Sequence, residues 1–114
     1  MKQKYIVDDI VMYKNRIHTI IETLGRNNYE LSYVEYPVNR AELSGVPITQ
    51  EFLEKNGWKK DDRGYGFRDI IFLNKDDFGS WAVGIGEDYI LTIASIHQLQ
   101  HLLFGLGLNS EMEV

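Results

Sequence analysis

Short runs of β-branched and aromatic residues alternate with turn residues along the first third of the chain. The pattern predicts strands at residues 10–13, 17–24 and 29–36. Turns are expected at residues 14–16, with Asn15 in the left-handed conformation that asparagine adopts at little cost, and at residues 25–28. Pro37 ends the third strand because proline cannot donate to a central ladder. The segment therefore predicts an antiparallel meander.

A short helix is predicted next. Residues 38–47 are irregular by composition, and Thr49 then caps a helix of about two turns. Gly57 lies where a left-handed residue is expected to follow such a helix. Because so short a helix is marginal in water, its apolar neighbours are expected to dock on a sheet: Phe52, Leu53 and Trp58.

Further strands and a longer helix complete the chain. Strands are predicted at residues 65–73, 80–85 and 89–93, after a charged loop at residues 59–64. Ser95 and Gln98 match a capping box at the start of the helix, which ends at Gly105 or Gly107. One helical stripe is apolar and is expected to be buried against the sheet: Ile96, Leu99, Leu102, Leu103 and Leu106.

Together these elements predict an α+β fold. We expect an antiparallel β-meander, as an SH3-like small barrel or a strongly bent sheet, with one short central helix and one C-terminal amphipathic helix. The 114 residues contain no internal repeat and no linker, so a single domain over residues 1–114 is expected. The hydrophobic fraction of 44% and the charged fraction of 25% are typical of a folded globular chain.

Composition and charge narrow the chemistry. The chain has no cysteine, which excludes disulfides, thiolate metal sites and cysteine nucleophiles. The net charge of -5 disfavours generic nucleic-acid binding. No apolar run approaches the roughly 18 residues that a membrane span needs, so no membrane partner and a cytoplasmic location are expected.

Two histidines raise the question of a metal site. His97 and His101 are four residues apart, so on a helix they share a face and can grip one ion. In the related zinc hydrolases a glutamate follows the first histidine as general base, and here that position is Gln98. The favoured interpretation is a polar helix face, with no metal and no cofactor. A metal-dependent enzyme using this pair is kept only as a remote alternative.

The best ligand candidate is the segment at residues 58–68. It interleaves aromatic rings with cations, which suits stacking on a base while charged donors hold an anion. The expected ligand contacts are Trp58 or Tyr65 for stacking and Lys59, Arg63 or Arg68 for phosphate, with His97 from the last helix added. The alternative, which the residues favour on their own, is a hairpin loop whose rings pack inward.

Other suggestive patterns have structural explanations. The glycines of Gly84-Ile85-Gly86 begin like a dinucleotide fingerprint, but a strand and not a helix follows, so a hairpin turn is expected. Four acidic doublets are interpreted as turn chemistry and solubility: Asp8-Asp9, Asp61-Asp62, Asp76-Asp77 and Glu87-Asp88.

A resemblance adds to these patterns. Residues 9–18 resemble the first hairpin of SH3-like small barrels, and residues 47–58 and 96–102 resemble a group of small uncharacterised proteins common in Bacteroidetes genomes and their phages. The similarity runs from about Asp9 to Val114. The chain differs from the usual pattern at Asn15, where glycine is expected, and at His101, where asparagine is expected. That second difference argues against a metal role for His101.

The resemblance implies a phage or mobile-element accessory protein, located in the host cytoplasm if phage-encoded. Small proteins of that origin often act by stoichiometric binding to a host protein or to a nucleotide signal of a defence system. We therefore expect a non-enzymatic binding protein, self-associating as a homo-oligomer, that sequesters a small anionic, nucleotide-like ligand. The alternative is a protein-binding inhibitor or adaptor that acts on a host protein.

Overall fold

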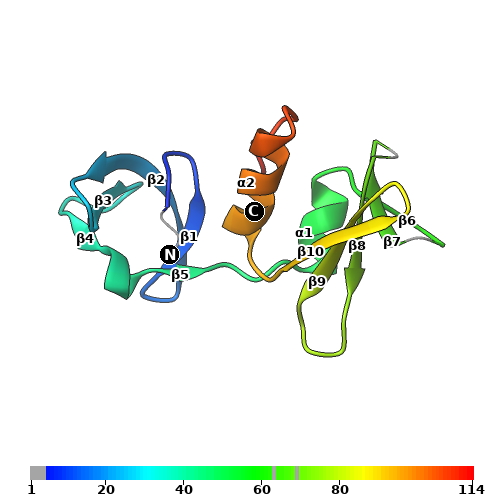
Figure 1. The fold of residues 1–114 in the computed structure, drawn as a ribbon. Coiled ribbons are helices and arrows are strands. Elements are labelled where there is room, and N and C mark those ends of the chain that lie inside the picture. The colour runs from blue at the N-terminus through cyan, green and yellow to red at the C-terminus, as the bar shows by residue number, and fades with distance from the viewer. Residues whose placement is uncertain (1–4, 63, 69) are drawn as a thin grey trace.

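The computed structural model describes residues 5–62, 64–68 and 70–114. These residues form two antiparallel sheets of five strands each and two α-helices, as Figure 1 shows. The predicted α+β class is confirmed. Neither sheet closes into a barrel within the described ranges, so the bent meander is the form that the structure takes.

The first sheet contains the N-terminal strands. Its order is β4-β3-β2-β1-β5. The strands are β1 (Ile10–Tyr13), β2 (Arg16–Leu24), β3 (Asn28–Leu31), β4 (Val38–Asn39) and β5 (Ser44–Gly45). Lys14 and Asn15, with φ of 49° and 63°, form the two-residue turn between β1 and β2. Two left-handed residues in succession give the turn that matches the twist of a hairpin, and the conformation predicted for Asn15 is confirmed.

Two predictions for this half are wrong. The third strand ends at Leu31 and not at residue 36, since Tyr33 has a φ of 63° and the chain turns there. Residues 38–47 are not irregular throughout, because they contain β4, β5 and a 3₁₀ turn, η1 (Arg40–Glu42). Strands of two residues carry no readable alternation, so tertiary pairing defines them.

The second sheet contains the later strands. Its order is β10-β9-β8-β7-β6. The strands are β6 (Lys59–Asp61), β7 (Gly64–Phe67), β8 (Ile71–Lys75), β9 (Trp81–Ile85) and β10 (Asp88–Ile93). The single strand predicted at residues 65–73 is wrong, since a turn containing Arg68 at φ 54° divides it. The loop predicted at residues 59–64 is wrong where β6 forms an exposed edge strand, whose polar residues show no buried face.

Both helices begin where their caps predict. Thr49 Oγ1 accepts from the backbone N–H of Phe52 at 3.1 Å at the start of α1 (Gln50–Lys55). Gln98 Oε1 accepts from the backbone N–H of Ser95 at 3.0 Å at the start of α2 (Ile96–Gly105). Gly57, with a φ of 87°, follows α1 as expected. Neither described helix is long and apolar enough to cross a bilayer.

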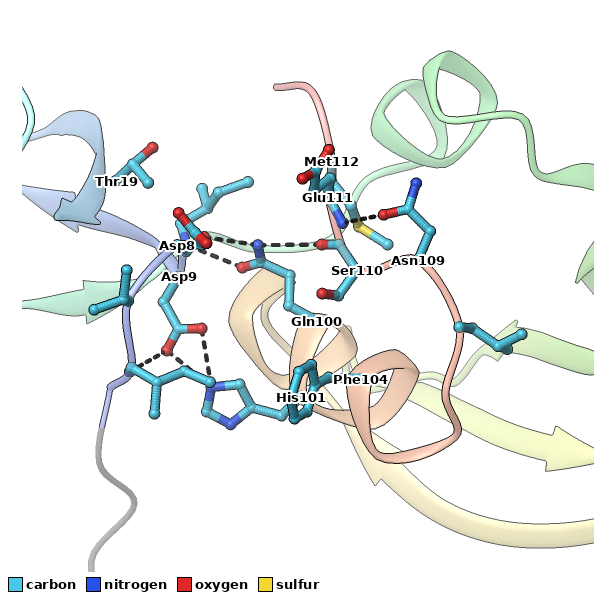
Figure 2. A pocket seen from close by; sticks show the side chains of 14 residues that line it. Asp8, Asp9, Thr19, Gln100, His101, Phe104, Asn109, Ser110, Glu111 and Met112 are labelled. Atoms are coloured by element: carbon cyan, nitrogen blue, oxygen red, sulfur yellow. Dashed lines mark hydrogen bonds and ion pairs between the residues drawn. The ribbon is translucent and has the colours of Figure 1, made fainter.

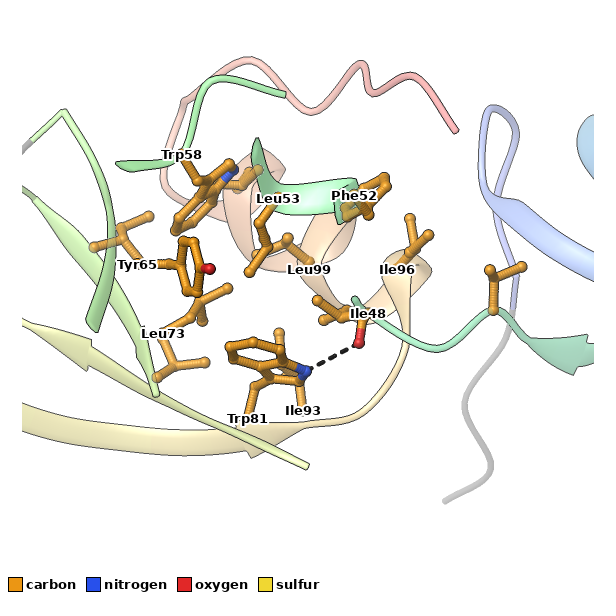
Figure 3. Close-up of a cluster of buried hydrophobic side chains, with 14 of the residues drawn as sticks. Ile48, Phe52, Leu53, Trp58, Tyr65, Leu73, Trp81, Ile93, Ile96 and Leu99 are labelled. Atoms are coloured by element: carbon orange, nitrogen blue, oxygen red, sulfur yellow. Dashed lines mark hydrogen bonds between the residues drawn. The ribbon is translucent and has the colours of Figure 1, made fainter. Parts of the chain in front are cut away.

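The hydrophobic core has two parts. The larger part lies between the second sheet and the two helices, where Trp81 and Leu99 are almost fully buried (Figure 3). The smaller part lies within the first sheet and includes Ile20 and Val38. Helix α2 lies between the two sheets in Figure 1 and contacts β1 as well as the larger core. The last helix therefore joins the two halves of the molecule.

Candidate functional site

Trp58 and Tyr65 do not form a binding surface. Their exposed fractions are 2% and 5%, and both belong to the larger core. The Trp58 ring stacks on Phe67 with centroids 5.1 Å apart, and the Tyr65 hydroxyl donates to Glu54 Oε2 at 3.0 Å (Figure 3 shows both rings pointing inward). The stacking role predicted for them is corrected to a packing role, because neither ring face is open to a ligand.

The cations of the same segment have different positions. Lys59 is exposed on the edge strand β6, and Arg68 is exposed beside the Phe67 ring, 5.4 Å from its centroid. Arg63 lies outside the described residues. Of the predicted phosphate contacts, Lys59 and Arg68 are thus exposed, whereas the aromatic half of the predicted anion site is absent.

The packing role of Trp58 predicts a difference between the two tryptophans. Trp81 Nε1 donates to the backbone oxygen of Ile48 at 3.1 Å, whereas Trp58 Nε1 has no partner among the described residues. Both Trp→Phe changes delete the same atoms, but only Trp81→Phe leaves a buried carbonyl oxygen without its hydrogen-bond donor. We expect Trp81→Phe to lower the unfolding free energy by about 1–3 kcal/mol more than Trp58→Phe, as measured by urea denaturation. Equal losses would contradict this assignment.

His97 is buried and not on an open helix face. Its exposed fraction is 5%, and its ring packs between Tyr5 at 5.0 Å and His101 at 5.9 Å, measured between centroids. Burial lowers the pKa of His97 from 6.5 to about 4, with a smaller contribution from the nearby His101. The ligand-binding role predicted for His97 is therefore not supported by an accessible imidazole.

The described residues do not assemble a metal site around the histidine pair. No group of three or more His, Asp or Glu side chains lies close enough to share an ion in the parts of the chain that the structure describes. His101 Nε2 instead donates to both carboxylate oxygens of Asp9, at 2.9 and 2.8 Å. Within this pair, His97 therefore lies in the interior and His101 is bound to a carboxylate.

A carboxylate–imidazole contact joins Asp9, which precedes β1, to His101 on α2. Asp9 is 1% exposed, and its Oδ2 also accepts from the backbone N–H of Ile6 at 2.9 Å. Burial raises the pKa of Asp9, although the hydrogen bonds from Ile6 and His101 act against that effect. The His101 side chain is 27% exposed, so a buried carboxylate orients an imidazole that reaches the surface.

Gln100 connects the same strand and helix. Its Oε1 accepts from the buried backbone N–H of Ile10 at 2.9 Å, and its Nε2 donates to the backbone oxygen of Asp8 at 2.9 Å. These bonds join residues at least 90 positions apart in the sequence. Asp8 has a φ of 77° and its N–H donates to Ile20 O, so a strained backbone precedes β1.

A pocket opens beside these contacts. It has a volume of about 450 Å³, and we call it the β1–α2 pocket. Its polar residues are Asp8, Asp9, Thr19, Gln100, His101, Asn109, Ser110 and Glu111. Its apolar residues are Ile6, Val7, Ile10, Phe104, Leu108 and Met112. Figure 2 shows the residues before β1 on one side, α2 on a second side and residues 109–112 on a third.

The pocket combines an apolar wall with hydrogen-bonding groups, which is the usual composition of a small-molecule site. The described lining residues include Asp8, Asp9 and Glu111 and no lysine or arginine. Such a lining favours a head group that donates hydrogen bonds over one that only accepts them. The pocket therefore suits a small amphipathic molecule and does not suit an anion.

The sequence patterns did not indicate this pocket. The sequence predicts turn chemistry for the doublet Asp8-Asp9, but only Asp8 is exposed and Asp9 is buried against α2. The sequence pattern singles out His101 only as the second member of a pair with His97. The available signal was Gln100, a polar residue beside the predicted apolar stripe, although its partners lie at the other end of the chain. Comparison of the chain with protein-family models, curated proteins and solved structures found no match.

Proposed function

We propose that the protein is a non-catalytic binding protein that holds a small amphipathic ligand in the β1–α2 pocket. The observation that carries the proposal is the buried Asp9 carboxylate, which orients the partly exposed His101 at a pocket of about 450 Å³. A buried charge is costly unless it is paired, so such a pair beside a pocket marks a candidate binding site.

The ligand's head group is assigned from the lining. Asp8 and Glu111 are exposed carboxylates on opposite sides of the pocket, as Figure 2 shows. Ionised carboxylates only accept hydrogen bonds, so an ammonium or another donor group is favoured over a carboxylate or phosphate. The apolar side chains of Phe104 and Met112 supply contacts for a short hydrocarbon chain.

An anionic, nucleotide-like ligand at residues 58–68 is a weaker proposal. It retains the exposed cations Lys59 and Arg68 and loses stacking by Trp58 and Tyr65. The phage or mobile-element origin, self-association and the protein-binding alternative stay predictions from the sequence.

A matched series of ligands tests the proposal. Hexylamine, hexanol and hexanoate share one hydrocarbon chain and differ in the head group, and AMP probes the nucleotide alternative. We expect saturable binding, strongest for hexylamine, weaker for hexanol and weakest for hexanoate. Calorimetry and the shift in melting temperature measure it. The proposal fails if none of the three hexyl compounds binds saturably. Binding of AMP alone would favour the 58–68 segment.

A charge variant locates the binding. Asp8→Asn removes one rim carboxylate and keeps a residue that tolerates the positive φ. We expect it to weaken hexylamine binding roughly two- to fivefold, the usual range for an exposed ion pair. The matched control is Asp88→Asn on the exposed edge of β10, which is expected to change nothing. The same loss in both variants would mean that binding reflects net charge and not the pocket.

A further inference from the structure

One wall of the β1–α2 pocket is formed by residues 109–112, which belong to the segment at residues 109–114 that follows α2. The end of α2 is fixed, since the N–H of Leu108 donates to Leu103 O at 2.9 Å and that of Gly107 to Phe104 O at 3.0 Å. With Gly107 at a φ of 73°, this is a Schellman motif. The segment then turns at Asn109, whose Oδ1 accepts from the N–H of Glu111 at 3.0 Å.

The far end of the segment is held by α1. Asn56 Nδ2 donates to Glu113 O at 2.8 Å, and the N–H of Glu113 donates back to Asn56 Oδ1 at 2.9 Å. Lys55 Nζ donates to Val114 O at 2.7 Å. One asparagine side chain therefore satisfies both backbone groups of Glu113, in the manner of a neighbouring strand.

The contacts that the structure shows between the middle of the segment and other described residues are few. Met112 packs against the larger core, but the bond from Gln100 Nε2 to Ser110 O is 3.5 Å long, at the limit for a hydrogen bond. Asn109, Glu111 and Glu113 are exposed. Few buried apolar contacts and solvent-exposed hydrogen bonds are the features of segments that open locally at low free-energy cost.

We propose that segment 109–114 opens locally and widens the mouth of the β1–α2 pocket for ligand, and that the two hydrogen bonds with Asn56 hold the segment against α1. The opening of the segment does not depend on a ligand, but its role in ligand access rests on the proposed function. Asn56 does not line this pocket, so it acts on ligand entry only through the segment.

Thiol labelling tests the inference without any ligand. The chain has no cysteine, so Ser110→Cys introduces a single thiol in the pocket wall with little change in shape. Ser110 is only partly buried, so the introduced thiol reacts slowly with a maleimide in the closed segment and faster when the segment opens. In this background we expect Asn56→Ala to raise the labelling rate about tenfold, the effect of losing one or two net hydrogen bonds.

A second variant separates the segment from α1. Asn56 Nδ2 also donates to Phe52 O at 2.9 Å, so Asn56→Ala disturbs the end of α1 as well. Glu113→Pro removes the N–H that donates to Asn56 Oδ1 and leaves the bond from Asn56 to Phe52 O in place. The matched control is Asn39→Ala, which deletes one exposed side-chain bond, to the N–H of Ala41, in the first sheet.

Faster labelling in both Asn56→Ala and Glu113→Pro, with an unchanged rate in Asn39→Ala, supports the inference. A rise in Asn56→Ala alone places the effect in α1 and overturns it. An equal rise in the Asn39→Ala control reports global destabilisation and also overturns the inference. An unchanged labelling rate in both Asn56→Ala and Glu113→Pro overturns it as well. The labelling uses no ligand, so it can fail while the hexylamine titration succeeds, and the reverse.

Discussion

Replacing Gln100 with leucine is expected to lower the unfolding free energy by roughly 2–4 kcal/mol, because one buried and one partly buried backbone group lose their partners. Leucine is close to glutamine in size, so the change creates little cavity. It leaves the N–H of Ile10 and the carbonyl oxygen of Asp8 without the bonds that Gln100 gives them at 2.9 Å. Urea denaturation followed by circular dichroism measures the loss.

A second glutamine on the same helix is the control. Gln98 accepts from the N–H groups of Ala94 and Ser95 at the start of α2, where water can replace it. Gln98→Leu is therefore expected to cost about 1 kcal/mol, the usual value of a helix cap. If Gln100→Leu cost no more than Gln98→Leu, the helix would not be what joins β1 to the rest of the molecule.

Acidification from pH 7 to pH 4 is expected to remove roughly 3 kcal/mol of unfolding free energy through His97. The pKa of His97 falls from 6.5 to about 4 on folding because burial disfavours the charged imidazole. Its neutral form therefore contributes its full stability above pH 6.5. That contribution is lost as the pH falls from 6.5 toward 4, since only the unfolded chain then takes up the proton.

Asp9 acts in the opposite direction. Burial raises the pKa of Asp9 above 3.8 in the folded state, so protonation of Asp9 at low pH favours folding. As the pH falls, the gain in stability from protonation of Asp9 therefore offsets part of the loss from His97. For this reason the His97 contribution is measured as a difference between variants and not from the unmodified chain alone.

His97→Phe isolates the effect. Phenylalanine keeps an aromatic ring beside Tyr5 and does not titrate, and the Nδ1 that it deletes has no hydrogen-bond partner among the described residues. Stability curves from pH 7 to pH 4 are expected to be flatter for His97→Phe than for the unmodified chain. Gln98→Leu, which changes the same helix and removes no titratable group, is the control expected to keep the original slope. An unchanged slope in His97→Phe would show that His97 is not held neutral by burial.

Local signals predicted the helix caps and the first turn correctly. Thr49 and Gln98 make the capping contacts that their positions indicated, and Asn15 adopts the expected positive φ. These features depend on residues within four positions of one another, so a single sequence carries enough information for them. The inward-packing alternative for residues 58–68 was also available from the pattern, and Trp58 and Tyr65 follow it.

Local sequence patterns do not predict the pocket. Its central contact joins Asp9 to His101, which are 92 residues apart, and no periodicity relates them. Asp8-Asp9 resembled the other acidic doublets, and only the docking of α2 distinguishes Asp9 from its neighbour. Strand β6 is not predicted for a related reason. An exposed edge strand has no buried face, so its sequence shows no alternation of apolar and polar residues.

A nuclear magnetic resonance titration of the full chain with hexylamine tests the ligand site most directly. We expect saturable shifts of backbone amides around the pocket, at Asp8, Thr19, His101 and residues 109–112, with residues 59–68 unaffected. Saturable shifts at residues 59–68 with none at the pocket, or the absence of any saturable shift, would contradict the assignment of the β1–α2 pocket as the binding site.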